Sequence, residues 1–388
     1  MLPAKIIPLL ALVFVPLVAW SKDATVPALV AAAAAVLANR DARAVAFSPP
    51  RLTLPVMLGI AFFTWALAAV MWSPAHRVTD WVKAVPVVLA ALVAGRYFAR
   101  APDQPLGRLA RPVFGAIAAL FMLLAVERAT GGGMIGLARQ GDSTERLFDI
   151  LSPGLALLSC LVFPGARLAE QATGRAWAGW GLIGAVFALA LTYRMDAAPV
   201  AIACATISYG LTRIGGKAGA LVIAAGITAV ALSWGALASL AWRHGEQAWL
   251  TAHANLNWGY RVEIWNRVFE LIGARPWIGY GFDSARLVAQ GPGVSFLHPH
   301  NGLLQVWLEL GTVGVALLLG WAAAALWAYL KAPRDPRGLA TCAATITALS
   351  VFWLISFGIW QGWWLAAIGL SFSALILSER AISRSPDR

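Results

Sequence analysis

Residues 298–330 read HPHNGLLQVWLELGTVGVALLLGWAAAALWAYL, and this stretch decides the kind of structure that the chain adopts. From residue 301 onward it is apolar with only isolated polar residues, and about 20 such residues in a helix cross the hydrocarbon core of a bilayer. Continuous apolar character, without alternation of polar and apolar residues, favours a membrane helix over a strand of a β-barrel. The stretch therefore predicts an all-α membrane protein.

The composition of the whole chain agrees with this prediction. Of the 388 residues, 60% are hydrophobic and 12% are charged. Soluble domains average about 45–50% apolar and about 25% charged residues, so a soluble enzyme is excluded, and so is a disordered chain. The net charge of +12 would suggest a nucleic-acid partner in a soluble protein, and must first be compared with membrane topology.

The apolar runs divide the chain into about twelve predicted transmembrane helices. They lie near residues 6–20, 24–38, 52–72, 81–98, 111–127, 147–163, 176–193, 196–212, 218–242, 301–330, 338–358 and 360–378. The first two and the eighth are short, and could be a re-entrant pair or tilted helices. We expect about nine helices in an N-terminal membrane domain over 1–242, a large loop over 243–300, and about three helices over 301–388.

The charged residues orient these helices in the membrane. With the N-terminus in the cytoplasm, the inner segments hold 18 of the 30 Lys and Arg residues and 6 of the 18 acidic residues. Because cytoplasmic segments are enriched in Lys and Arg, both termini are predicted to be cytoplasmic. The outer side keeps 12 cations and 12 acids, so topology accounts for the whole basic excess and no nucleic-acid partner is predicted.

The large outer loop is predicted to fold. Loops longer than about 12–15 residues are usually functional or disordered, and the many Trp and Tyr residues of this loop favour a folded cap. Apolar spacing after Arg261 predicts an amphipathic helix in the loop, with one buried face. That face consists of Val262, Trp265, Val268 and Phe269.

The candidate chemistry lies where this loop enters the long apolar helix. Asn301 can cap the helix, which places His300 at a helix N-terminus on the outer interface. The positive end of the helix dipole disfavours an imidazolium there, and a neutral imidazole is what a general base requires. An ordinary interfacial hydrogen bond is the alternative, and metal binding by His298 and His300 is a weaker one. Glu309 lies deeper in the helix, and we favour a structural hydrogen bond for it.

Two arginines are candidates for binding phosphate. Arg194 follows an apolar run at the outer end of a helix, and Arg261 lies in the amphipathic helix of the loop. Guanidinium groups bind phosphate through two parallel hydrogen bonds and keep their charge at any relevant pH. The alternatives are a salt bridge, Arg194 with Asp196 or Arg261 with Glu263, or contact with lipid headgroups.

The motif His300-Asn301, nine residues, Gly311, two residues and Gly314 resembles the signature of the O-antigen ligase/polymerase superfamily. Arg194 at the end of its helix and the stretches after Arg261 and Arg275 are also similar to that family, although Tyr193 stands where the family usually has Ser. Gly311 and Gly314 are predicted to admit a neighbouring helix closely. The resemblance covers roughly Tyr193–Leu330, and it implies a GT-C-like membrane architecture.

The resemblance implies a glycosyltransferase of the bacterial inner membrane with its active site facing the periplasm. Its donor would be a glycan on undecaprenyl diphosphate, and its acceptor the lipid A core or a growing glycan. His300, Arg194 and Arg261 would be catalytic, the arginines replacing a metal ion. No cofactor is expected. Further substrate-binding residues would be Arg275, Arg286, Trp265 and Asn301.

Two alternative functions stay open on the sequence. A polymerase of the same fold would join repeat units of O-antigen or another exported polysaccharide. A transporter would have repeated halves, broken helices and polar groups at the bilayer midplane. The ionisable candidates gather instead at the outer interface, which favours the ligase.

Overall fold

The computed structural model describes residues 3–47, 52–245, 256–290 and 296–382, and these ranges are helical without a strand. The predicted all-α class is confirmed. The elements are α1 (Pro3–Leu17), η1 (Lys22–Ala24), α2 (Thr25–Ala38), α3 (Arg40–Ala46), α4 (Leu54–Ala68), η2 (Ala69–Trp72), α5 (Val78–Arg100), α6 (Asp103–Ala129), α7 (Gly133–Ala138), α8 (Thr144–Thr173), α9 (Trp177–Thr192), α10 (Ala197–Arg243), α12 (Leu256–Ala274), α13 (Ala285–Val288), α14 (Gly302–Lys331), α15 (Pro336–Ile355) and α16 (Gly362–Ile382). Residues 246–255 and 291–295 of the predicted large loop lie outside the described ranges.

Helices occupy the predicted spans, but fewer of them are long enough to cross a bilayer. Eight described helices qualify by length and hydropathy, which makes the chain a multi-pass membrane protein. One of them, α10, is 47 residues long and consists of two helices that meet at Gly216, where φ is 56°. By contrast, α1 and α2 have 15 and 14 residues, below the about 20 of a straight span. The total of twelve therefore stays a prediction.

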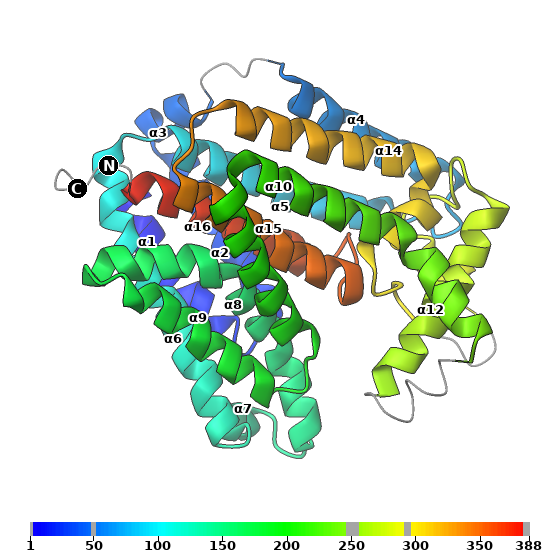
Figure 1. Cartoon of the computed structure of the whole chain (residues 1–388), viewed down its shortest axis with the longest axis horizontal. Coiled ribbons are helices and arrows are strands. Elements are labelled where there is room, and N and C mark those ends of the chain that lie inside the picture. Colours follow the sequence, from blue (N-terminus) through cyan, green and yellow to red (C-terminus); the bar gives the residue numbers. More distant parts are fainter. Residues whose placement is uncertain (1–2, 48–51, 246–255, 291–295, 383–388) are drawn as a thin grey trace.

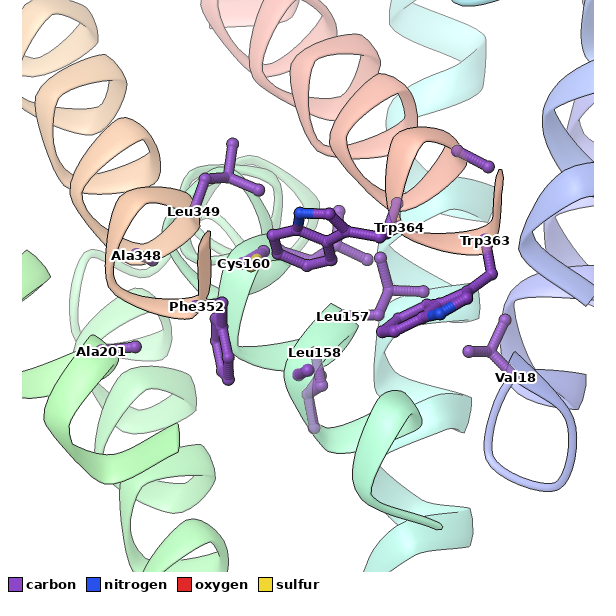
Figure 2. Close-up of a cluster of buried hydrophobic side chains, with 14 of the residues drawn as sticks. Val18, Leu157, Leu158, Cys160, Ala201, Ala348, Leu349, Phe352, Trp363 and Trp364 are labelled. Atoms are coloured by element: carbon purple, nitrogen blue, oxygen red, sulfur yellow. The ribbon is translucent and has the colours of Figure 1, made fainter. Parts of the chain in front are cut away.

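The interior of the bundle is formed by α8, α15 and α16. In the most apolar windows of α8 and α15, 72% and 78% of the residues are buried, against 17% in α10, which presents apolar side chains outward. Trp363 and Trp364 at the start of α16 pack against Leu157 and Leu158 of α8 and Phe352 of α15 (Figure 2). This packed core is apolar, so the polar chemistry must be sought at the ends of the helices.

The long helix α14 is interrupted at Gly311, which has a φ of 68°. The segment 276–281 lies against the break, and the Tyr280 N–H donates to the Leu308 carbonyl at 2.9 Å. A Cβ atom on Gly311 would overlap the backbone of Trp277, so glycine is required here. The sequence predicted close approach of a neighbouring helix at this glycine, whereas the approaching backbone belongs to a loop.

Glu309 lies just before the break and is wholly buried. Its carboxylate accepts hydrogen bonds from the Trp360 indole at 2.6 Å, the Gln305 amide at 3.1 Å, and the Asp283 N–H at 3.1 Å. The structural hydrogen bond that the sequence favoured for Glu309 is confirmed. A broken helix with a buried carboxylate is a feature that the transporter alternative predicts, but this carboxylate is used to hold loops of the same chain.

The two ends of the bundle differ in structure (Figure 1). α3 and the end of α16 lie at one end, and α12 lies at the other, beside the start of α14. His300, which immediately precedes α14, therefore lies at the α12 end of the molecule.

Candidate active site

The helix α12 covers the segment that leads into α14. Val262, Trp265 and Val268 have exposed fractions of 5%, 3% and 0%, as the predicted apolar face requires, while Phe269 is half-buried. The Trp265 indole N–H donates to the Pro299 carbonyl at 2.8 Å and so fixes α12 on the His-Pro-His turn. Because its ring is enclosed, Trp265 presents no open face for stacking, and its assignment to sugar binding stays a prediction.

The turn before α14 is closed by its own polar groups. The Asn301 side chain accepts a hydrogen bond from the Leu304 N–H at 2.9 Å, which confirms the predicted helix cap. His300 has a φ of 53°, in the left-handed region that few non-glycine residues adopt. Its N–H donates to Nδ1 of His298 at 3.2 Å. Cap and turn together hold the His300 ring in one place.

The ring of His300 is oriented by the end of α15. Its Nδ1 lies 2.9 Å from the carbonyl oxygen of Ser356. A carbonyl oxygen only accepts, so we assign the proton to Nδ1, which leaves the lone pair on Nε2. No hydrogen bond to Nε2 is present among the described residues. A histidine held in this tautomer is suited to accept a proton at Nε2.

Both histidines of the turn are held in the neutral form. Burial is the main cause that lowers the pKa of His300; Arg261 lowers it further, and the Ser356 hydrogen bond raises it. Burial and the neighbouring charges of His300, Arg286, Lys22 and Arg261 lower the pKa of His298 to about 3. The neutral imidazole expected at position 300 agrees with this direction, although burial is its main cause and the sequence had pointed to the helix dipole.

Arg261 is anchored next to His300. Its guanidinium donates to the carbonyl oxygen of Ile355 at 2.7 Å, the residue before the partner of His300, and lies 5.4 Å from the centre of the Trp258 ring. Burial lowers the pKa of Arg261, but a guanidinium stays charged near neutral pH. The end of α15 thus brings together His300 and Arg261, two of the three catalytic candidates from the sequence. The structure shows this contact of Arg261 in place of the alternative ion pair with Glu263.

Arg286 lies on the other side of His298. Its guanidinium pairs with the buried Asp283 carboxylate through two 2.8 Å contacts, and the Asp283 N–H is in turn held by Glu309. Arg286 lowers the pKa of His298, which places its charge within reach of the turn. The sequence named Arg286 as a reserve phosphate ligand, and that role stays a prediction.

Two predicted arginines are not part of this cluster. Arg194 pairs with Glu145, and both side chains are exposed, at 62% and 75%. Its predicted partner, Asp196, instead accepts a hydrogen bond from the Trp258 indole at 3.0 Å, which connects the Arg194 turn to α12. Arg275 lies 4.8 Å over the Tyr280 ring, beside the break in α14. No contact in the described residues joins Arg194 or Arg275 to His300.

Sequence reasoning missed the backbone partners of the site. The carbonyls of Ile355 and Ser356 orient Arg261 and His300, and no side chain marks them. The one sequence feature that pointed to these carbonyls was the predicted end of the helix near residue 358. The last carbonyls of a helix lack partners within it and are free to accept other hydrogen bonds. In the described ranges, no group of three or more His, Cys, Asp or Glu could hold a metal ion.

The comparison with known families bears on this geometry. Residues 150–319 match the family model described as O-antigen ligase. This part of the chain is similar to the O-antigen ligase family. The matched residues include Arg194, Arg261 and His300, and they begin upstream of the stretch that carried the sequence resemblance.

Curated relatives are similar to this chain over a short region. A protein of Rickettsia prowazekii named "Putative polysaccharide ligase" is 33% identical over 120 residues, which cover 27% of this chain and 29% of the relative. Similarly named proteins of Rickettsia felis and Rickettsia typhi are 30% and 32% identical over 28% and 27% of this chain, and 29% of each relative. The matched region thus spans less than a third of each relative. No solved structure matches the chain.

Proposed function

We propose that the chain is a ligase-type glycosyltransferase of the bacterial inner membrane. It moves a glycan from undecaprenyl diphosphate to a sugar hydroxyl of the lipid A core, with both termini in the cytoplasm and the α12 end facing the periplasm. The family of residues 150–319 and the relatives named as polysaccharide ligases support this reaction class. Lipopolysaccharide biosynthesis is the process that such a reaction serves.

The observation that carries the proposal is the 2.9 Å contact between Nδ1 of His300 and the Ser356 carbonyl oxygen, from which the tautomer is assigned. The Nδ1–H group donates a hydrogen bond to the Ser356 carbonyl, and Nε2 accepts the proton of the acceptor hydroxyl. The hydroxyl oxygen then attacks the anomeric carbon and forms the new C–O bond with inversion. The bond from that carbon to the diphosphate breaks, and its electron pair leaves with the diphosphate.

Cationic side chains stabilise the leaving diphosphate in this scheme. Arg261 stands beside His300 at the end of α15, and Arg286 stands beside His298. Arg194 would join them by exchanging its exposed partner Glu145 for the donor, with Arg275 as a more distant ligand. Charge stabilisation of this kind replaces a metal ion in the proposed mechanism. Asn301 contributes through its cap, which fixes the backbone next to the base.

Transfer with purified components tests the proposal. The protein in nanodiscs is mixed with a glycan on undecaprenyl diphosphate and a core-oligosaccharide acceptor, and the product is followed by gel and mass spectrometry. We expect transfer to proceed in excess EDTA at the rate measured without it. Strict dependence on an added divalent ion would contradict the mechanism, and absence of transfer to every sugar acceptor would contradict the function.

A deletion strain separates the ligase from a polymerase of the same fold. Loss of a ligase leaves long polymer on undecaprenyl diphosphate, whereas loss of a polymerase leaves single repeat units. Lipid-linked glycans extracted from the deletion strain distinguish the two by length. If neither species accumulates, both assignments fail.

Replacing Arg194 with lysine is expected to remove most of the transfer activity, while Glu145→Gln leaves it at or above the wild-type rate. Lysine keeps the charge but lacks the planar fork that binds two phosphate oxygens. Glu145 only occupies Arg194 in an exposed pair, and such pairs contribute little to stability. The initial transfer rate at equal protein level measures both variants. Equal losses in the two would indicate that the ion pair is structural.

The transfer rate is expected to fall at acid pH only below the ordinary range of histidine. A base must be neutral, and burial lowers the pKa of His300, so the imidazole stays neutral down to below about pH 6.5. A profile of kcat/KM against pH should therefore be flat from neutral pH to about 6.5 and decrease below it. A decrease that begins above pH 7 would show that His300 is not the titrating base.

A further inference from the structure

Lys22 occupies a position that the sequence did not single out. It lies in η1, the short turn between α1 and α2, and its side chain is exposed. Its ammonium lies 5.9 Å over the ring of Trp363, and the Thr25 hydroxyl bridges the carbonyls of Lys22 and Trp363 at 2.8 and 3.0 Å. Among the described residues, Lys22 forms no ion pair. A lysine that packs on an aromatic ring and is not paired with a carboxylate can still bind an anion.

This turn is connected to the candidate active site through the start of α16. The Trp363 ring packs edge-on against Phe357 at 4.6 Å, and Phe357 follows Ser356, the carbonyl partner of His300. On the next residue, Gly358, a Cβ atom would lie 2.9 Å from the His298 ring. Lys22, Trp363 and the two histidines therefore surround one region of the molecule.

Three cations from distant parts of the chain act on the same imidazole. Lys22, Arg261 and Arg286 each disfavour the protonated form of His298, and no carboxylate of the described residues opposes them there. Within the part of the chain that the structure describes, Arg286 is the one of the three that pairs with an acid, Asp283. Gathering like charges in a partly buried region costs free energy unless an anion is bound among them.

We propose that Lys22 is a further binding residue for the diphosphate of the lipid-linked donor, acting with Arg261 and Arg286. This inference rests on the proposed function. A diphosphate has two phosphate groups with several acceptor oxygens, and Lys22 supplies a point charge on a flexible stem for one of them, whereas Arg261 supplies a planar fork. Lys22 lies between α1 and α2, which are both apolar, and this position suits an anion held on a lipid.

The test compares Lys22→Met, Lys22→Gln and Lys22→Arg in nanodiscs. Methionine keeps an apolar stem for packing on Trp363 without the charge, and arginine keeps the charge. Arg139→Gln serves as the control, because Arg139 is an exposed cation outside the cluster. KM is measured separately for the lipid-linked donor and for the acceptor. Binding of undecaprenyl diphosphate and of undecaprenyl monophosphate is measured without acceptor.

We expect Lys22→Met and Lys22→Gln to raise the donor KM about tenfold, the value of one charge-assisted hydrogen bond. The affinity for undecaprenyl diphosphate should fall by the same factor, with a smaller effect on the monophosphate. Lys22→Arg and Arg139→Gln should stay near wild type, and the acceptor KM should not change.

An unchanged donor KM with unchanged diphosphate binding would overturn the inference. A rise in the acceptor KM alone would also overturn it, because it would assign Lys22 to an anionic group of the acceptor. Failure of the proposed function is a separate outcome: the wild-type protein would then transfer to no sugar acceptor, whatever the Lys22 variants do to diphosphate binding.

Discussion

Replacing His300 with asparagine is expected to reduce transfer by about 10²–10⁴-fold, the contribution of a general base. Asparagine suits this position because His300 has a φ of 53°, which Asn adopts more readily than most residues. Its side-chain amide can still donate to the Ser356 carbonyl, the partner of the Nδ1 proton. What it lacks is an acceptor at the position of Nε2. Initial rates with purified protein measure the loss of transfer. His300→Ala should lose at least as much activity as His300→Asn.

The matched control is His244→Ala, since His244 is an exposed histidine directly after α10. It should transfer at the wild-type rate. Thermal unfolding of the His300→Asn variant should occur near the wild-type temperature, because the substitution keeps the backbone conformation and the hydrogen bond. Wild-type transfer by a well-folded His300→Asn variant would remove His300 from the mechanism.

The sequence predicted those features that depend on neighbouring residues. Continuous apolar character placed the helices, and the position of Asn301 before an apolar run placed the cap. The buried face of α12 followed from apolar spacing, except at Phe269. Each of these signals is local, since a helix and its cap are decided within a few residues.

The features that the sequence did not predict depend on contacts between distant parts of the chain. Arg194 pairs with Glu145, 49 residues upstream, and His300 bonds to a carbonyl 56 residues downstream. The break at Gly311 exists because segment 276–281 bonds to its backbone. Glycine is common in membrane helices, so its presence alone does not predict a break in the helix. Only the fold shows which glycine has another backbone segment packed against it.

Replacing Arg261 with glutamine is expected to lower kcat by about 10²–10³-fold, the usual cost of losing one donor aimed at developing charge. Arg261 donates to the Ile355 carbonyl at 2.7 Å, which leaves its other N–H groups for the diphosphate. Glutamine can keep one such bond but carries no charge. Arg261→Lys should lie between glutamine and wild type, because lysine restores the charge without the fork.

The same helix supplies the control for this prediction. Arg267 lies on α12, is exposed, and pairs with Glu270 at 3.7 Å, so Arg267→Gln should keep kcat near wild type. If the two variants lost activity equally, the loss would reflect the stability of α12 and not the leaving group. A second readout separates these cases: a donor with a better leaving group than diphosphate should recover activity in Arg261→Gln. A destabilised helix would not be rescued in this way, because the donor does not repair its packing.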